Sequence, residues 1–389
     1  MTAMVTSRLL QLLQKADPAQ AVLSASQVDL GLADNVHFPF LALIGQAEMK
    51  SALVMGLITP QIGGVLLIGP RGTGKTTAVR GLIDLLPMVE RSTCPLGCTA
   101  EAAEAGGMDA VCPQCAQKLG RGEPLTALDR VRLIELPLNV QLEDVIGGIN
   151  ERLAIEQQKV RLDRGILSFA DQNLLYVDEV NLLNDDIVNA ILDAAAQGSY
   201  TVRRGPLTNT YRARFTLIGS MNPEEGTLRP QIMDRFGLRV VVSGLSTNEE
   251  RREVTRRVQA FHDNRYEFVA RLAEATEQVA NEINVARARL PQVTVAPAAE
   301  RLALELVSHL RIHSSRAEIV TLQAARARAA ADEREMADVA DVAAVAPMAL
   351  RLRYSSFIAE YIEARHQEDT AIQETLDSLL QTDGPEGKR

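Results

Sequence analysis

The segment from Gly69 to Thr76 constrains the fold of this chain more than any other stretch of its sequence. It reads Gly-Pro-Arg-Gly-Thr-Gly-Lys-Thr, follows the apolar run 65–68 and precedes a helix-like stretch over 77–86. This spacing, between a strand and a helix, is typical of phosphate-binding loops. Glycines let backbone N–H groups close around phosphate oxygens, and the helix N-terminus adds a positive dipole. The sequence therefore predicts a nucleotide-binding α/β fold.

The chemistry of the loop follows from its last residues. We expect Lys75 to reach the β- and γ-phosphates and the Thr76 hydroxyl to ligate Mg²⁺. The predicted cofactors are therefore ATP and Mg²⁺. The predicted nucleotide-binding residues are Gly69, Pro70, Arg71, Gly72, Thr73, Gly74, Lys75, Thr76 and Thr77.

The composition argues against several other classes of protein. With 389 residues, 46% of them hydrophobic, the chain has room for two or three ordinary globular domains. Its formal net charge of −9 argues against general nucleic-acid binding, which usually needs a basic face. No apolar run approaches the roughly 18 residues that cross a bilayer, and the first eight residues lack a signal-peptide core. We therefore expect a cytoplasmic protein.

Four further apolar runs of β type follow the loop, at 132–136, 174–177, 215–218 and 238–242, with helical patterns between them. This alternation predicts a parallel sheet covered by helices on both faces. Beyond residue 244 we expect no strands, only helices over 247–285 and 297–383, with breaks at Leu290-Pro291 and Ala346-Pro347. The predicted organisation is an N-terminal extension (1–36), an α/β domain (37–245), a helical lid (246–383) and a polar tail (384–389).

Polar residues follow two of the predicted strands. The run 174–177 ends in Asp178 and Glu179, which we expect to hold Mg²⁺ through water and to polarise the attacking water, respectively. The next strand ends near Asn222, whose amide can hydrogen-bond both that water and the γ-phosphate. A solvated strand end and an Asn-Pro turn are the alternatives for these two places.

Arg235 lies near the start of the last predicted strand, far along the sequence from the phosphate loop. The functional hypothesis is an arginine finger that clamps developing phosphate charge in the site of a neighbouring subunit. The alternative is a solvated or ion-paired arginine.

The order of these motifs resembles that of an AAA+ ATPase, and more narrowly ATPase subunit I of magnesium chelatase, in the branch that also contains the MoxR-type chaperones. The resemblance is strong over 37–245 and weaker over the lid. The segments that carry it are 38–46, 62–65, 164–167, 176–183, 213–215 and 222–237.

The resemblance implies an ATP-driven homo-oligomeric ring, commonly a hexamer, with each ATP site between subunits. Such a ring helps to insert Mg²⁺ into protoporphyrin IX in chlorophyll or bacteriochlorophyll biosynthesis. Two partners are implied: a second AAA+ subunit with a von Willebrand-type metal domain, and a porphyrin-binding subunit. The Asp-x-Ser-x-Ser signature of that metal domain is absent from this sequence, so we expect the ATPase subunit alone. No membrane or nucleic-acid partner is expected.

Further residues acquire roles only through the resemblance. The segment 315–326 is similar to the one that carries the second sensor of the family, which makes Arg316 the predicted lid arginine, with a solvated helical arginine as the alternative. Two insertions typical of the branch are expected around 138–170 and in a hairpin from 200–206 to 210–214, both facing the partner subunit.

The chain also departs from the family pattern. Residues 136–148 differ from the usual family sequence, and the insertion at 150–158 and the lid diverge as well. These departures leave the ATPase core intact but leave the partner and substrate open. A cobalt-chelatase paralogue or a MoxR-type chaperone would share the core. A DNA motor is a third alternative, for which the hairpin arginines are suggestive and the overall acidity is unfavourable.

All four cysteines fall in one predicted insert, residues 92–118. They form two pairs, Cys94-x₃-Cys98 and Cys112-x₂-Cys115. In a chain without other cysteines, this pattern predicts a tetrahedral zinc site. An iron–sulfur cluster, reduced thiols and disulfides remain as alternatives.

Overall fold

The computed structural model describes residues 36–94, 98–107, 111–149, 162–205 and 207–355, together with residues 370 and 373. The chain divides into two units, Met1–His37 and Phe38–Arg389, and the elements described below belong to the second. Nearly all of the predicted extension, the polar tail and residues 150–161 of the first predicted insertion lie outside the described residues.

A five-stranded parallel sheet has the strand order β4-β5-β8-β1-β9. Its strands are β1 (Val65–Ile68), β4 (Leu133–Leu136), β5 (Leu174–Val177), β8 (Thr216–Met221) and β9 (Leu238–Val241). They correspond to the five apolar runs of the sequence, so the predicted α/β sheet is confirmed. Val177 of β5 lies opposite Gly219 of β8, and Ile68 of β1 lies opposite Met221. The carboxyl ends of these three strands therefore meet at one edge.

The sheet is buried on both faces because its residues alternate between two hydrophobic cores. In β5, Leu174 and Tyr176 belong to one core, while Leu175 and Val177 belong to the other. The first core includes residues of α3 (Ala47–Ile58) and α4 (Lys75–Gly81). The second includes α10 (Asp185–Gln197), with the short helices α7 (Leu142–Ile146), α9 (Ile166–Phe169) and α11 (Pro230–Arg235) beside it.

The described part of the segment after β9 is mostly helical, as predicted, and nearly all of 356–383 of the predicted lid lies outside the described residues. Its helices are α12 (Asn248–Asp263), α13 (Arg265–Ala270), α14 (Ala273–Arg289), α15 (Pro297–His309), α16 (Arg316–Ala331) and α17 (Val339–Leu350). Helix α16 is rich in buried alanines, which join the same core as α3. Small side chains allow the helices to approach closely, so this core can be continuous with that of the sheet.

Two predictions for this segment are wrong. The short strands β10 (Thr294–Val295) and β11 (Met336–Ala337) pair in parallel beyond residue 244, where we expected no strands. Pro347 does not break a helix but lies within α17. Pro347 and Ala343, the residue whose carbonyl loses its donor, are both exposed, so water can replace the missing hydrogen bond. The break at Pro291 is confirmed, because α14 ends at Arg289.

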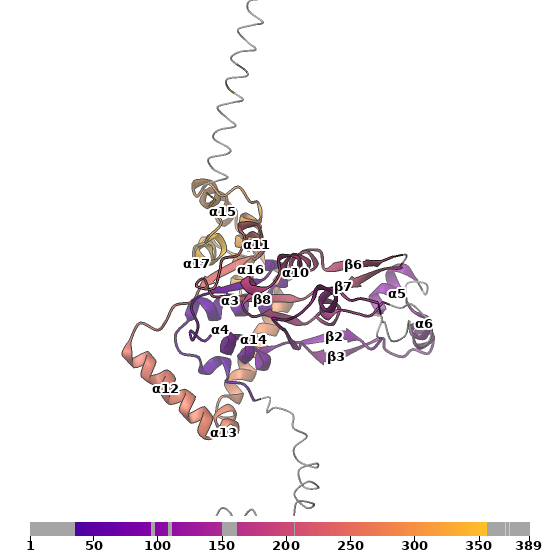
Figure 1. The fold of residues 1–389 in the computed structure, drawn as a ribbon, viewed down its shortest axis with the longest axis horizontal. Helices are drawn as coiled ribbons and strands as arrows, with labels where there is room; N and C mark the ends of the chain where they lie inside the picture. Colours follow the sequence, from indigo (N-terminus) through magenta and orange to yellow (C-terminus); the bar gives the residue numbers. More distant parts are fainter. Residues whose placement is uncertain are drawn as a thin grey trace, which may run out of the picture. The chain divides into compact units, whose positions relative to one another are not determined.

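Two antiparallel ribbons complete the described structure. Strands β6 (Ser199–Arg204) and β7 (Leu207–Arg212) form the predicted hairpin. Strands β2 (Met88–Ser92) and β3 (Thr126–Arg130) form a second ribbon, and α5 (Ala100–Gly106) and α6 (Pro113–Gly120) lie at its end (Figure 1). Among the described helices, none combines the length and apolar character needed to span a membrane.

Candidate functional site

The phosphate loop joins β1 to α4 and is shaped by two glycines. A Cβ atom on Gly69 would lie 2.1 Å from the carbonyl oxygen of Val242, so a larger residue does not fit there. Gly74 adopts a φ of +85°, which L-residues rarely take. Lys75 follows as the first residue of α4 and is only 9% exposed. Its Nζ donates to the carbonyl oxygens of Gly69 (2.6 Å) and Pro70 (2.8 Å), which places the ammonium group inside the loop.

The electrostatics around Lys75 favour an anionic ligand. Burial lowers the pKa of the ammonium group, while the carboxylates of Asp178, Glu179 and Glu225 oppose this shift. A lysine that has lost part of its hydration gains more from a phosphate than an exposed lysine does. The loop therefore presents a desolvated cation at the place where the sequence predicted a phosphate.

Asp178 directly follows β5 and is held by three hydroxyl groups. Thr76 Oγ1 donates to its Oδ2 atom (3.2 Å), and Tyr176 OH donates to its Oδ1 atom (2.7 Å). The Ser220 hydroxyl, from β8, also donates to Oδ1. Hydroxyl and carboxylate oxygens are ligands that Mg²⁺ prefers. The facing Thr76 hydroxyl and Asp178 carboxylate thus fit the ion predicted for them.

Glu179 is the first residue after Asp178 and turns the chain sharply. Its φ of +48° lies in the left-handed region, and its N–H donates to Ser220 Oγ (2.9 Å). Non-glycine residues in this conformation are often found at functional sites. Its carboxylate lies 3.4 Å from Arg71, which makes a closer ion pair with Glu225 (2.6 Å). The Glu179 carboxylate is thereby oriented toward the phosphate loop.

Asn222 follows β8 and is only 2% exposed. Its Oδ1 accepts a hydrogen bond from the N–H of Glu224 (3.2 Å), which fixes the orientation of the amide. The predicted residues of the loop from Arg71 to Thr77 and of both strand ends line one cleft of about 320 Å³, whereas Gly69 and Pro70 do not line it. The lining residues are Arg71, Gly72, Thr73, Gly74, Lys75, Thr76, Thr77, Asp178, Glu179, Ser220 and Asn222.

Sequence reasoning assigned no role to Tyr176, Ser220 or Glu225. The sequence could have indicated Tyr176 and Ser220, because each lies two residues before a predicted site residue. Residues two apart on a strand project toward the same face of the sheet. Tyr176 precedes Asp178 in this way, and Ser220 precedes Asn222. Glu225 had no such signal, because only the tertiary structure brings it to Arg71.

A second, mostly apolar pocket of about 640 Å³ adjoins the phosphate loop. Gly72, Gly74 and Thr77 line one side, and Phe38, Ile44 and Met49 are among the residues that line the rest. A planar apolar group such as a nucleotide base suits a pocket of this kind. The sequence analysis did not predict this pocket.

Arg235 and Arg316 do not line the phosphate cleft. Both line a different cavity of about 1000 Å³. Arg235, at the end of α11, pairs with Asp193 of α10 at 2.7 Å. Arg316, at the start of α16, lies 3.3 Å from the Oδ2 atom of Asp234. The predicted finger arginine and the predicted lid arginine therefore line one cavity, and each is paired with a carboxylate of the same chain.

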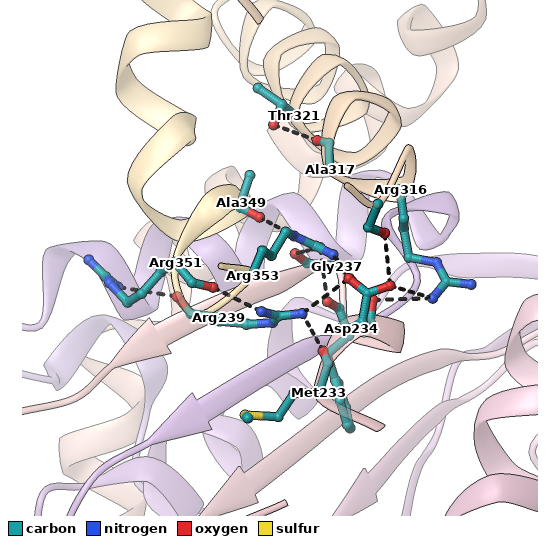
Figure 2. Close-up of polar contacts among 12 residues, drawn as sticks. Met233, Asp234, Gly237, Arg239, Arg316, Ala317, Thr321, Ala349, Arg351 and Arg353 are labelled. Atoms are coloured by element: carbon teal, nitrogen blue, oxygen red, sulfur yellow. Dashed lines mark hydrogen bonds and ion pairs between the residues drawn. The ribbon is translucent and has the colours of Figure 1, made fainter. Parts of the chain in front are cut away.

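Asp234 lies at the centre of an arginine cluster, which we define as Asp234, Arg239, Arg316 and Arg353 (Figure 2). Arg353, just beyond α17, donates from Nη1 to Asp234 Oδ1 (2.6 Å) and from Nη2 to the carbonyl oxygen of Gly237 (2.9 Å). Arg239 of β9 lies 3.7 Å from the same carboxylate, and the side chains of Arg239 and Arg353 are fully buried. Asp234 thus ties α11 to the sheet and to two helices of the lid.

The four cysteines lie in the insert between β2 and β3, and none of them lines the phosphate cleft. Their Sγ atoms all lie within 4.8 Å of one another. The tertiary structure thus brings the two predicted pairs together.

Comparison with known proteins decides the family. Residues 61–222 match the model of the AAA domain, and residues 301–375 match the model of the AAA lid domain. A magnesium-chelatase subunit ChlI homolog from Methanocaldococcus jannaschii is 40% identical over 75% of this chain and 79% of its own. The magnesium-chelatase 38 kDa subunit of Acidiphilium rubrum is 39% identical over 81% of this chain and 90% of its own. The chain belongs to the magnesium-chelatase ATPase-subunit family.

This membership confirms the predicted AAA+ class and the predicted fold, a parallel sheet followed by a helical lid. Magnesium-chelatase subunit ChlI of Synechocystis is 36% identical over 85% of this chain and 91% of its own. A crystal structure of a proposed ATPase from Cytophaga hutchinsonii shares the fold, with a TM-score of 0.52 at 21% identity, over 85% of this chain and 90% of that one.

Proposed function

We propose that this chain is the ATP-hydrolysing subunit of a magnesium chelatase and drives Mg²⁺ insertion into protoporphyrin IX in chlorophyll or bacteriochlorophyll biosynthesis. The observation that carries the proposal is the convergence of Lys75, Thr76, Asp178, Glu179 and Asn222 on one cleft, in a chain of this family.

Binding of MgATP follows from the contacts of the cleft. Lys75 replaces its hydrogen bonds to the carbonyl oxygens of Gly69 and Pro70 with hydrogen bonds to phosphate oxygens. The partly desolvated ammonium group thereby gains a negatively charged partner. Thr76 and Asp178 hold the Mg²⁺ ion that accompanies the phosphates, and the apolar pocket beside the loop takes the base. Bound Mg²⁺ would neutralise charge on the β- and γ-phosphates.

Hydrolysis then requires a water in line with the γ-phosphate. Glu179 accepts hydrogen bonds from that water and polarises it, and Asn222 orients the water against the phosphate. The left-handed backbone at Glu179 and its N–H bond to Ser220 hold the carboxylate at the mouth of the cleft. Arg71 competes for this carboxylate at 3.4 Å, and its closer pair with Glu225 limits that competition.

The position of Arg235 and Arg316 supports a ring, for which we propose six subunits. Both arginines line a cavity separate from the cleft of their own chain, yet the predicted target of Arg235 is the phosphate of a bound nucleotide. If the cavity of one subunit faces the cleft of the next, both arginines reach a nucleotide together. Assembly would then switch hydrolysis on, because each site is incomplete in one subunit.

The partners belong to the same proposal. We propose that the ring works with a second AAA+ subunit that carries a von Willebrand-type metal domain, and with a porphyrin-binding subunit. The β6–β7 hairpin supports a docking role for this side of the chain, because its strands stand outside the central sheet.

The test is Mg²⁺ insertion into protoporphyrin IX by the purified chain with ATP and the other two chelatase subunits of the same organism. We expect insertion that depends on this chain and is lost with Lys75→Ala. ATP hydrolysis without insertion of Mg²⁺ would contradict the chelatase assignment. In that case insertion of Co²⁺, or remodelling of a partner protein, would identify the cobalt-chelatase or MoxR-type alternative.

A further inference from the structure

We propose that Cys94, Cys98, Cys112 and Cys115 form a closed tetrathiolate zinc site at the end of the β2–β3 ribbon. All four Sγ atoms lie within 4.8 Å of one another, and those of Cys94 and Cys112 are 3.6 Å apart. Zinc–thiolate bonds of about 2.3 Å place the sulfur atoms of a tetrahedron about 3.8 Å apart. A disulfide would need about 2.05 Å. The observed spacing therefore suits one shared ion.

Local hydrogen bonds explain how the chain brings the two pairs together. Ser92, the last residue of β2, accepts the N–H of Cys94 (3.1 Å) and donates its hydroxyl to the carbonyl oxygen of Cys98 (2.5 Å). These bonds hold both cysteines of the first pair beside Ser92, at the end of the ribbon. Thr93 extends the ribbon by one more backbone bond, to Leu125 (2.9 Å).

The second pair lies at the start of α6. Cys112 precedes the first turn of this helix and Cys115 lies within it, so both sulfurs are close to its positive end. The N–H of Cys112 also donates to the Sγ atom of Cys98 (3.3 Å), which links the two pairs. Each of these features stabilises negative charge on sulfur, and four thiolates around Zn²⁺ carry a net charge of −2.

The insert has too small a hydrophobic core to hold its fold without such a link. Its core contains Cys98, Ala103, Val111, Cys115 and Leu125, and it is separate from both cores of the sheet. Apart from the two cysteines, the buried members among the described residues are one alanine and two medium-sized aliphatic side chains, with Ala116 and Leu119 partly buried against them. Independently packed segments below about 40 residues usually need a metal or disulfides. A metal bound by all four cysteines would supply the missing stabilisation.

The ligand set determines the kind of metal and its role. Thiolates are soft ligands that favour zinc, whereas Mg²⁺ requires oxygen ligands. The site therefore cannot deliver the Mg²⁺ of the proposed reaction. Four protein ligands leave no open position, which is typical of structural zinc. Sulfur ligands of an iron–sulfur cluster surround several atoms and must lie farther apart than those of one ion.

The first experiment uses the full-length chain purified under reducing conditions and measures its metal content by mass spectrometry. We expect one zinc per chain. After exchange into Co²⁺, we expect the intense visible bands of a tetrahedral cobalt thiolate. A chain that contains no zinc and takes up neither ion would overturn the proposal, and so would stoichiometric iron or two disulfides by mass.

The second experiment compares two single substitutions in α6. Cys115→Ser should lower the zinc content at least tenfold, whereas Ala116→Ser, which adds a hydroxyl to the neighbouring residue, should leave the zinc content unchanged. Equal zinc in both variants would contradict the proposal.

Because Cys115→Ser can also unfold the insert, wild-type protein provides an independent test. A thiol-specific mercurial should release one zinc per chain, and protease sensitivity within 92–126 should then increase. Release of zinc without added sensitivity would contradict a structural role. This proposal is independent of the proposed function, because an ATPase without zinc or a zinc protein without chelatase activity would be recognised separately.

Discussion

The phosphate cleft and the arginine cluster differ in how the chain builds them. In the cleft, Asp178 and Asn222 directly follow β5 and β8, and the phosphate loop leads from β1 to Lys75, so one parallel sheet brings the three residues together. In the cluster, Asp234 and Arg316 come from separate elements that are 82 residues apart along the chain. Their contact depends on how the lid docks on α11.

Under the proposed function, this difference separates the residues that bind the nucleotide from the arginines that complete the site for hydrolysis. The cleft holds the groups that we propose bind MgATP and position water, while Arg235 and Arg316 lie in another cavity with carboxylates of their own chain. Under the proposed function, one subunit receives an arginine at its cleft and supplies its own arginine to a neighbour.

The largest effect should come from Arg235→Ala, which removes the proposed finger. We expect assembly and nucleotide binding to persist, with ATP hydrolysis lowered about 1000-fold, because the finger compensates transition-state charge. The measurement is steady-state phosphate release by the assembled protein.

Mixing Arg235→Ala subunits with Lys75→Ala subunits tests whether Arg235 acts across the subunit interface. Lys75→Ala subunits have a defective cleft but an intact Arg235. In an equal mixture of the two variants, about a quarter of the interfaces should combine an intact cleft with an intact finger. Hydrolysis should return to about that fraction of the wild-type rate. A mixture as inactive as its components would show that Arg235 does not act across the interface.

Glu179→Gln should lower hydrolysis about 100-fold, because an amide cannot polarise the attacking water as a carboxylate does. Nucleotide affinity should stay within about threefold of wild type, since Lys75 and Thr76 are unchanged. Binding of a fluorescent ATP analogue and phosphate release provide the two measurements. Undiminished turnover would exclude this role for Glu179.

Asp234→Asn should lower stability by about 2 kcal/mol, because hydrogen bonds to charged groups are each worth about 1.5–3 kcal/mol. The substitution removes the negative charge between Arg316 and the buried Arg353. Denaturant unfolding gives the free energy. Asp263→Asn, at the exposed end of α12, is the matched control and should change it by less than about 0.5 kcal/mol. Equal free energies of unfolding for the two variants would contradict a stabilising role for Asp234.

The smallest effect should come from Asp193→Asn, which releases Arg235 from its partner within the chain. Because Asp193 is more than half exposed, this pair is worth at most about 1 kcal/mol. Hydrolysis by the assembled ring should therefore rise by less than about fivefold. A fall to the level of Arg235→Ala would mean that Asp193 positions the finger instead of restraining it.

Much of the fold and of the cleft could be predicted from the sequence because the signals are local. A buried parallel strand reads as an apolar run, and the polar residue after it lies at a known edge of the sheet. Lys75, Asp178 and Asn222 are all of this kind. Tyr176 and Ser220 also carried a local signal that the sequence analysis did not use, since they lie two residues before Asp178 and Asn222.

Pro347 shows where local reasoning fails. A proline commonly ends a helix, yet α17 continues through Pro347, where this proline and the residue with the affected carbonyl are both exposed. The cost of the missing hydrogen bond depends on the surroundings of that carbonyl, which the sequence does not specify. The β10–β11 pair is a similar case, because two residues per strand are too few to show a pattern.

The sequence by itself determined the phosphate loop, the strand-end carboxylates and the two cysteine pairs, because each depends on residue type and short spacing. Only the tertiary structure decided that the four thiols converge, that Glu225 pairs with Arg71, and that Arg235 and Arg316 lie in one cavity. These contacts join segments that are distant along the chain, and they arise from the docking of whole elements, for which no short stretch of sequence carries a signal.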